Sequence, residues 1–161
     1  MDINPHFSWK KFTDMITFYT IGFTKKSAEQ FFGLLRYNGV KQLVDVRINN
    51  SSQLAGFAKG KDLEFFTNEI CHIPYKHIVD FAPTKELLDQ WHKQEVTWQE
   101  YMEIYTKILK DRDVAKKHDA KSFDGACFLC SEDTPEQCHR RLLAEYLQEH
   151  SKEKVRIVHL I

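Results

Sequence analysis

TFYTIGFTKKSAEQFFGLLRYNGVKQLVDV, residues 17–46, is the stretch of sequence that decides the fold. Its first six residues, 17–22, are rich in β-branched and aromatic side chains, which predicts a short buried strand. Ser27 and Gln30 then have the spacing of a capping box, which predicts a helix that ends at the following Asn-Gly dipeptide. Residues 41–46 predict a second buried strand. A strand, a helix and a strand joined by short loops are typical of a parallel βαβ unit.

Later segments continue this pattern. Residues 126–131, ACFLCS, predict a third strand that is apolar throughout, as the strands of buried parallel sheets are. Residues 155–161, VRIVHLI, predict another strand. Capping boxes predict helices after Thr97 and again after Thr134, where Pro135 would occupy the first helical position. We therefore expect the α/β class, with three layers, a mostly parallel sheet of four to five strands, and helices on both faces.

Length and composition predict one domain. The 161 residues are 42% hydrophobic and 13% aromatic, which is enough for a hydrophobic core. We expect a single α/β domain over 1–161, in which residues 1–16 are an N-terminal extension of the body at 17–161. The first residues lack the layout of a signal peptide, and no later stretch approaches the roughly 20 apolar residues of a membrane helix. The sequence thus predicts a cytoplasmic protein with no membrane partner.

Charge and cysteine content narrow the classes of function. Twenty-three basic residues balance twenty-three acidic ones. Any attraction to nucleic acid or phosphate would therefore come from a local cluster of charge. In a chain with no predicted export signal, the cysteines are interpreted as free thiols or ligands rather than disulfides. They are Cys71, Cys127, Cys130 and Cys138.

The candidate site lies beyond the carboxyl ends of the predicted strands, where open parallel sheets bind their ligands. This rule selects the loops after the strands, and these loops contain polar side chains that can do chemistry. The predicted catalytic residues are Asp45, Cys130, Glu132, Cys138 and His139, and the predicted anion-binding residues are Thr24, Arg47, Ser52 and Arg140.

The stretch CSEDTPEQCHRR, residues 130–141, admits several interpretations. A zinc site built on the C-x-x-C pair Cys127 and Cys130 is disfavoured, because side chains alternate along a strand and these two point to opposite faces. Cys127 is then a core residue. Cys130 at the strand end and Cys138 in the following helix can approach each other over the crevice. A reactive thiol, favoured by the helix N-terminus and Arg140, competes here with a pair of small buried residues.

Two arginines indicate an anionic ligand. Arg140 near the start of a helix and Arg47 from the neighbouring strand would converge on one pocket, where they could hold a phosphate or a carboxylate. The alternative is that both arginines form salt bridges with Asp45 and Glu132 that brace the loops. Glu132 is also a candidate general acid or base, with His139 as its partner.

Several longer motifs occur in one order along the chain. They are YTIGFT at 19–24, LVDVR at 43–47, NNSSQLAGF at 49–57, YKHI at 75–78, FAPTKELLD at 81–89 and FLCSEDTPEQCHRRLLAEYL at 128–147. This series resembles the family catalogued as domain of unknown function 488 (DUF488), over essentially everything after residue 17. The resemblance implies an α/β domain of uncharacterised activity, with the predicted site residues among its motif positions. The family's usual His-Ser after TIG is Phe23 and Thr24 here, so any chemistry of that histidine would be changed or lost.

Three functions are consistent with these features. The first is an enzyme that acts on a phosphate-bearing ligand, a nucleotide or nucleic acid, by hydrolysis or group transfer. The second is a non-catalytic module that binds a nucleotide or nucleic acid. Its basic rim would consist of Lys25, Lys26, Lys59 and Lys61. The third is a thiol- or metal-dependent function of Cys130, Cys138 and His139. No cofactor is predicted apart from the transition metal that this third function allows, and the expected partner is an anionic small molecule or a nucleic acid.

Overall fold

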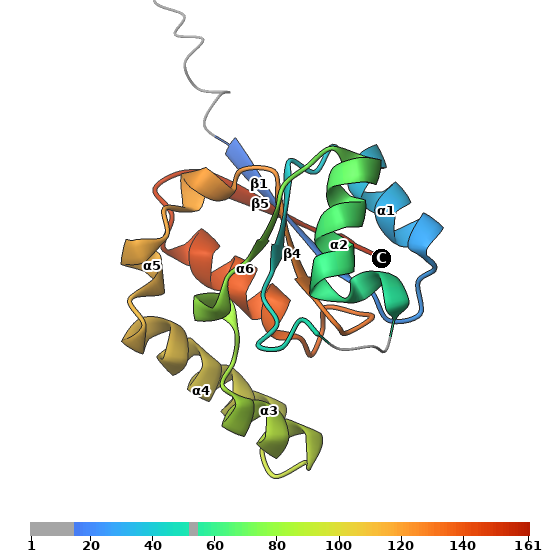
Figure 1. Cartoon of the computed structure of the whole chain (residues 1–161). Helices are drawn as coiled ribbons and strands as arrows, with labels where there is room; N and C mark the ends of the chain where they lie inside the picture. The colour runs from blue at the N-terminus through green and yellow to red at the C-terminus, as the bar shows by residue number, and fades with distance from the viewer. Residues whose placement is uncertain (1–14, 52–54) are drawn as a thin grey trace, which may run out of the picture.

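Five parallel strands form one sheet at the centre of the molecule (Figure 1). The computed structural model describes residues 15–51 and 55–161. The strands follow the spatial order β3-β2-β4-β1-β5, so the first strand of the chain lies inside the sheet. Their bounds are β1 Met15–Gly22, β2 Gln42–Asp45, β3 Tyr75–His77, β4 Ala126–Cys130 and β5 Lys154–Leu160. The predicted α/β class with a parallel sheet is confirmed.

Helices cover both faces of this sheet, as the three-layer prediction requires. Helices α1 and α2 lie over one face and α6 lies over the other (Figure 1). The helices are α1 Ala28–Tyr37, α2 Gly60–Phe66, α3 Lys85–His92, α4 Trp98–Asp111, α5 Val114–Lys117 and α6 His139–Glu149. Short helical segments lie at Gly56–Ala58, Thr67–Cys71, Val79–Phe81 and Ala120–Phe123.

The alternation of side chains along the strands produces two hydrophobic cores. On the α6 face, Phe18 and Phe128 pack edge to face, with ring centroids 5.5 Å apart, and Leu143 of α6 belongs to the same core. On the α1 face, Leu129 packs in a second core with Phe31 of α1. All five residues of β4 are buried, because this strand has a neighbour on each side and a layer on each face.

Two of the three predicted capping boxes are confirmed. At α1, the Ser27 hydroxyl accepts from the Gln30 amide at 3.1 Å, and the Gln30 side chain accepts from the Ser27 amide at 2.9 Å. Thr97 and Glu100 form the same reciprocal pair at α4. These hydrogen bonds satisfy backbone N–H groups that the first helical turn leaves without partners.

The third predicted box is wrong. Helix α6 begins at His139, with Cys138 as its N-cap, and the residues from Thr134 onward form turns. The physical reason is that the carbonyl oxygens of Glu132 and Asp133 accept hydrogen bonds from the Arg140 guanidinium. The segment between β4 and α6 folds around this side chain instead of starting a helix.

One expected boundary differs from the structure. The predicted N-terminal extension at 1–16 includes Met15 and Ile16, which belong to β1 and pair with β5. The remaining residues, 1–14, lie outside the described part of the chain.

Within residues 15–51 and 55–161, no helix is both long and apolar enough to cross a membrane.

The two outcomes at the capping boxes generate a stability prediction. Thr97→Ala removes a hydroxyl that caps α4, so the free energy of unfolding should fall by about 1 kcal/mol. Thr134→Ala makes the same chemical change at an exposed residue that caps no helix, and it should cost less than half as much. Urea denaturation of both variants measures the difference, and equal losses would contradict the capping assignment.

Candidate functional site

The carboxyl ends of the three central strands bring the candidate residues to one edge of the sheet. Cys130 ends β4 and is the register partner of Gly22, which ends β1. Asp45 ends β2 and is the register partner of Leu129. The loop after β4 then leads into α6, which begins over the same edge. The topology therefore gathers Cys130, Cys138 and His139 where the sequence predicts a crevice.

The side chains of Cys130 and Cys138 meet in the core below this edge. Their sulfur atoms are in direct contact, and the two residues are only 1% and 2% exposed. Their Cα atoms are 7.8 Å apart, whereas the Cα atoms of disulfides lie about 4.4–6.8 Å apart. The Cα separation is thus wider than that of an ordinary disulfide, although the two side chains turn toward each other. The two cysteines are two thiol groups that share one site.

His139 completes this group. One of its ring nitrogens and the two sulfur atoms all lie within 4.8 Å of one another. Its Nε2 lies 3.0 Å from the carbonyl oxygen of Val46. Because a carbonyl can only accept, Nε2 carries the proton and Nδ1 keeps a free lone pair. Burial lowers the pKa of His139 to about 4, so the imidazole is neutral at pH 7.

Arg140 is the buried cation of the site. Its side chain is fully buried, and its Nη1 donates to the Cys130 sulfur at 3.1 Å and to the Cys138 sulfur at 3.5 Å. The other hydrogen bonds of the guanidinium that the described residues show go to Glu132 O, Asp133 O and Thr20 Oγ1. Burial lowers the pKa of Arg140 to about 10, which leaves it charged at pH 7. A buried charge needs opposite charges nearby, and here the carboxylates of Glu132, Asp133 and Glu136 act on the guanidinium, while the two sulfur atoms are in direct contact with it.

The loop around Arg140 requires a glycine in β1. A Cβ atom added at Gly22 would overlap the carbonyl oxygen of Glu132 and would lie 2.9 Å from Arg140 Nη1. The glycine therefore lets the loop between β4 and α6 pass close enough for the 2.6 Å bond between Arg140 and the Glu132 carbonyl. The glycine of the TIG motif is therefore needed for the loop between β4 and α6 to pack against β1.

Asp45 and Arg47 form a separate ion pair. The Arg47 Nε and Nη2 atoms bind the Asp45 carboxylate at 2.8 and 2.6 Å, and Nη2 also donates to the Ala58 carbonyl at 2.8 Å. The Arg47 guanidinium lies over the ring of Phe23, 5.2 Å from its centroid, and Phe23 and Ala58 belong to the core on the α1 face. For Asp45 and Arg47 the structure shows the bracing salt bridge that was the alternative interpretation. Arg47 is also among the residues that line the cavity described next, and Arg140 is not, so the two arginines do not converge on one pocket.

A cavity of about 170 Å³ opens next to the thiols. It lies between the loop that follows β2, the loop that follows β4, and the helices α3 and α4. Its lining includes Cys130, Cys138, His139, Glu132, Leu88, Trp91 and Tyr101. Glu132 is exposed to solvent at this cavity, so the structure places it near the thiols as the sequence predicts.

The remaining predicted residues contribute less. Thr24 is exposed, and its amide donates to the Ser131 carbonyl at 3.2 Å, which ties the loops after β1 and β4 together. Ser52 lies outside the described residues. Cys127 packs in the α1-face core, whereas Cys130 packs in the α6-face core. The prediction that these two cysteines point to opposite faces is confirmed.

Sequence reasoning missed the aromatic wall of the cavity. Trp91 and Tyr101 have ring centroids 5.6 Å apart and come from α3 and α4, which form a helical hairpin. Tyr101 is 2% exposed and belongs to the core on the α6 face. Only the fold shows that the same face also borders the thiols.

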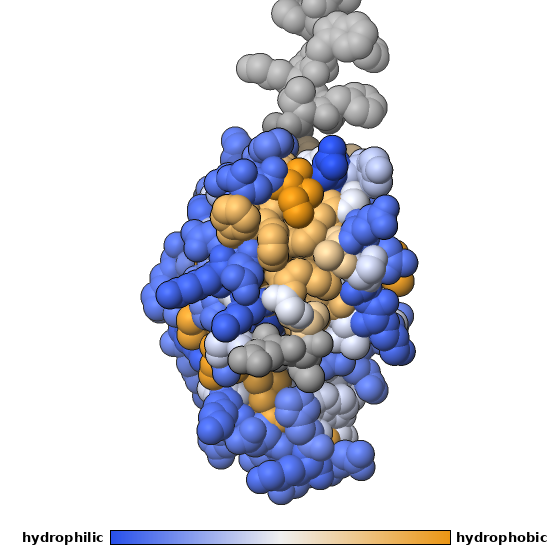
Figure 2. Space-filling view, turned by 45° about the vertical axis from the view of Figure 1, so that its right-hand side comes forward, coloured by the Kyte–Doolittle hydropathy of each residue, from blue (hydrophilic) through white to orange (hydrophobic). Residues whose placement is uncertain are grey.

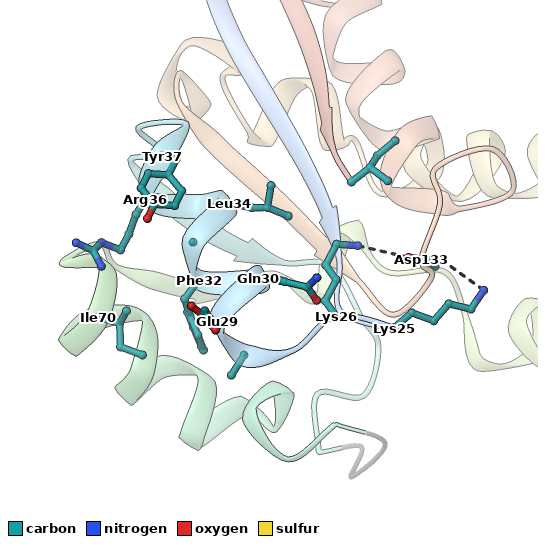
Figure 3. Close-up of a pocket in the computed structure, with 13 residues that line it drawn as sticks. Lys25, Lys26, Glu29, Gln30, Phe32, Leu34, Arg36, Tyr37, Ile70 and Asp133 are labelled. Carbon is teal, nitrogen blue, oxygen red and sulfur yellow. Dashed lines mark hydrogen bonds and ion pairs between the residues drawn. The ribbon is translucent and has the colours of Figure 1, made fainter.

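A larger hollow of about 810 Å³ lies along α1, on the opposite side of the β4–α6 loop (Figure 3). In Figure 3, Lys25 and Lys26 reach from the start of this hollow toward Asp133, at 3.6 and 3.5 Å. Figure 2 brings this side of the molecule forward and shows an apolar area framed by hydrophilic side chains. None of the described residues that line this hollow is a cysteine or a histidine, so the smaller cavity is the one that borders the candidate reactive groups.

Comparison with protein families agrees with this description. The family model described as "Domain of unknown function DUF488" matches residues 27–147, from the start of α1 to near the end of α6. The chain belongs to the DUF488 family. No curated protein and no solved structure matches it. The DUF488 match includes every residue of the Cys130, Cys138 and His139 group and both helices of the aromatic wall, so the site lies within the family domain.

The close passage at Gly22 generates the second prediction. Gly22→Ala should lower the free energy of unfolding by at least about 2 kcal/mol, because the new methyl group and the Glu132 carbonyl cannot occupy the same space. Gly56→Ala is the matched control, since a Cβ there meets no atom of the described residues within 4 Å. That change should alter stability by less than about 0.5 kcal/mol in the same denaturation experiment. A Gly22→Ala protein as stable as Gly56→Ala would show that the loop does not pack as described.

Proposed function

We propose that this protein is an enzyme whose reaction centre is the group of Cys130, Cys138 and His139, and that it acts on a small molecule in the adjacent cavity. The observation that carries this proposal is the convergence of three side chains with reactive atoms within 4.8 Å of one another, at the edge where parallel sheets place their ligands. A purely structural cluster would not need a cavity against the sulfurs, and this cluster borders one.

Electrostatics supports a chemical role for the sulfurs. The Arg140 guanidinium donates to both sulfur atoms from a fully buried position. A positive charge in contact with a thiol favours the thiolate, which is the nucleophilic and metal-binding form of cysteine. His139 adds a neutral imidazole with a free Nδ1, able to accept a proton or bind a metal.

The reaction class that suits these groups is hydrolysis or group transfer. Glu132, exposed at the cavity, is the candidate general acid or base. Trp91, Leu88 and Tyr101 would contact the apolar part of the substrate. The cavity of about 170 Å³ holds a small molecule or one end of a larger one.

A phosphate-bearing substrate, the first expectation from the sequence, remains a hypothesis with less support. It depends on two arginines that converge on one anion. Arg47 lines the cavity, but its guanidinium is engaged with the Asp45 carboxylate, and Arg140 is engaged with carbonyl oxygens and sulfur. The thiol- or metal-dependent function therefore has the stronger geometric support.

The test begins with a panel of small phosphate esters, carboxylic esters, amides and nucleotides, assayed for turnover by the wild-type protein. On any substrate found, Cys138→Ser should lower kcat/KM by at least about 100-fold, because it replaces a reacting sulfur with almost no change in volume. Cys127→Ser makes the same change on the other face of the sheet, outside the cavity. It should leave kcat/KM within about threefold of wild type.

Glu132→Gln separates the roles within the centre. As a general acid or base, Glu132 would affect kcat more than KM, so the variant should lose at least about tenfold in kcat with KM little changed. Turnover that survived Cys138→Ser would refute the proposed reaction centre. If Glu132→Gln keeps wild-type turnover while Cys138→Ser loses it, Glu132 is not part of the reaction centre and the thiols remain in it.

A further inference from the structure

The group of Cys130, Cys138 and His139 has the composition of a metal site. Thiolate sulfur and imidazole nitrogen are the ligands that Zn²⁺ prefers in proteins, and two cysteines with one histidine leave one position of a tetrahedron open. We propose that this group binds one Zn²⁺ ion, whose open coordination position faces the cavity of Trp91 and Tyr101. This inference rests on the proposed function, since it names the cofactor of the same centre.

The backbone separation of the cysteines is the first argument. A Cα distance of 7.8 Å is too wide for an ordinary disulfide. In a zinc site each sulfur lies about 2.3 Å from the ion, so two ligating cysteines stand farther apart than two bonded ones. Small rotations of the two side chains would therefore admit an ion between sulfur atoms that now touch.

The orientation of His139 is the second argument. Histidines that bind metals usually donate their other ring N–H to a carboxylate, a water or a backbone carbonyl, which fixes the tautomer and the plane of the ring. His139 makes this bond through Nε2 to the Val46 carbonyl. Its Nδ1 is thus deprotonated and available, as a ligand atom must be.

The placement of the ligands on the chain is the third argument. Cys130 ends a fully buried strand, and Cys138 and His139 are the N-cap and first residue of α6. Each ligand is therefore attached to a rigid element. The hydrogen bonds from Arg140 to the carbonyl oxygens of Glu132 and Asp133 fix the loop between them. The N–H groups of Arg140 that reach both sulfurs supply the hydrogen bonds that commonly support metal-bound thiolates.

The charge of the group changes when the ion binds. Zn²⁺ and two thiolates sum to zero, and the positive charge of Arg140 then interacts with the carboxylates of Glu132, Asp133 and Glu136, whose charges act on it. Binding of Zn²⁺ forms two Zn–S bonds and releases to solvent the protons that the thiols still hold.

The experiment uses the full chain purified without a histidine tag. Elemental analysis should find about one zinc per chain in the wild-type protein, or after incubation with ZnCl₂ followed by gel filtration. In competition with a chromogenic chelator, Cys138→Ser and Cys130→Ser should bind Zn²⁺ at least about 100-fold more weakly than wild type. Cys127→Ser, which alters a cysteine on the other face, should bind it as wild type does.

Replacement of the zinc by Co²⁺ makes the test independent of variants that fail to fold. The wild-type cobalt protein should show sulfur-to-cobalt charge-transfer bands with the intensity of two thiolate ligands, and the strong visible bands of tetrahedral Co²⁺. Bands of one thiolate, or of an octahedral ion, would overturn the proposed ligand set. So would stoichiometric zinc that remains bound to the Cys138→Ser protein with wild-type affinity.

The outcomes separate this inference from the proposed function. If wild-type protein binds no zinc but its turnover still depends on Cys138, the metal inference is overturned and the enzyme works through a thiol. If zinc binds to the three residues but no substrate requires them, the metal inference is confirmed and the enzyme proposal fails.

Discussion

The Arg140 guanidinium is the interaction on which the rest of the site depends. It holds the carbonyl oxygens of Glu132 and Asp133, and it contacts the sulfurs of Cys130 and Cys138 from a fully buried position. A buried charge that lost these partners would carry a large desolvation cost, so the chain between β4 and α6 is forced to wrap around it. The start of α6, the approach of the two thiols and the need for glycine in β1 all follow from this one constraint.

The sequence was most informative where local patterns and the global fold agree. The βαβ unit, the buried strand before Cys130 and the boxes at Ser27 and Thr97 depend on short-range rules, and the structure confirms them. The same rules failed at Thr134, because a capping motif cannot reveal that the neighbouring carbonyls are bound by an arginine from the next helix. The location of Cys130, Cys138 and His139 was predictable from strand ends, but the aromatic wall and the separation of Arg47 from Arg140 required the packing of α3, α4 and the sheet.

The departure of this chain from the family pattern has a structural counterpart. Phe23 stands where the resemblance to DUF488 leads us to expect histidine, and its ring packs against the Arg47 guanidinium. The residue thus stabilises the Asp45–Arg47 pair, which Tyr75 also supports through a 2.7 Å hydrogen bond to Asp45. This pair fixes the loop after β2, and the neighbouring Val46 carbonyl in turn orients His139. Phe23 therefore contacts a residue, Arg47, that also lines the cavity next to the thiols.

The position of β1 inside the sheet has a consequence for how the chain acquires its structure. This strand is the first of the described elements, yet its two neighbours, β4 and β5, are the last two strands to leave the ribosome. During synthesis β1 cannot pair with its two neighbouring strands until most of the described chain has emerged from the ribosome. Contacts between such distant segments slow folding and expose strand edges to other chains. Early in synthesis β1 therefore has none of its native strand neighbours, which is the state in which a strand pairs most readily with another chain.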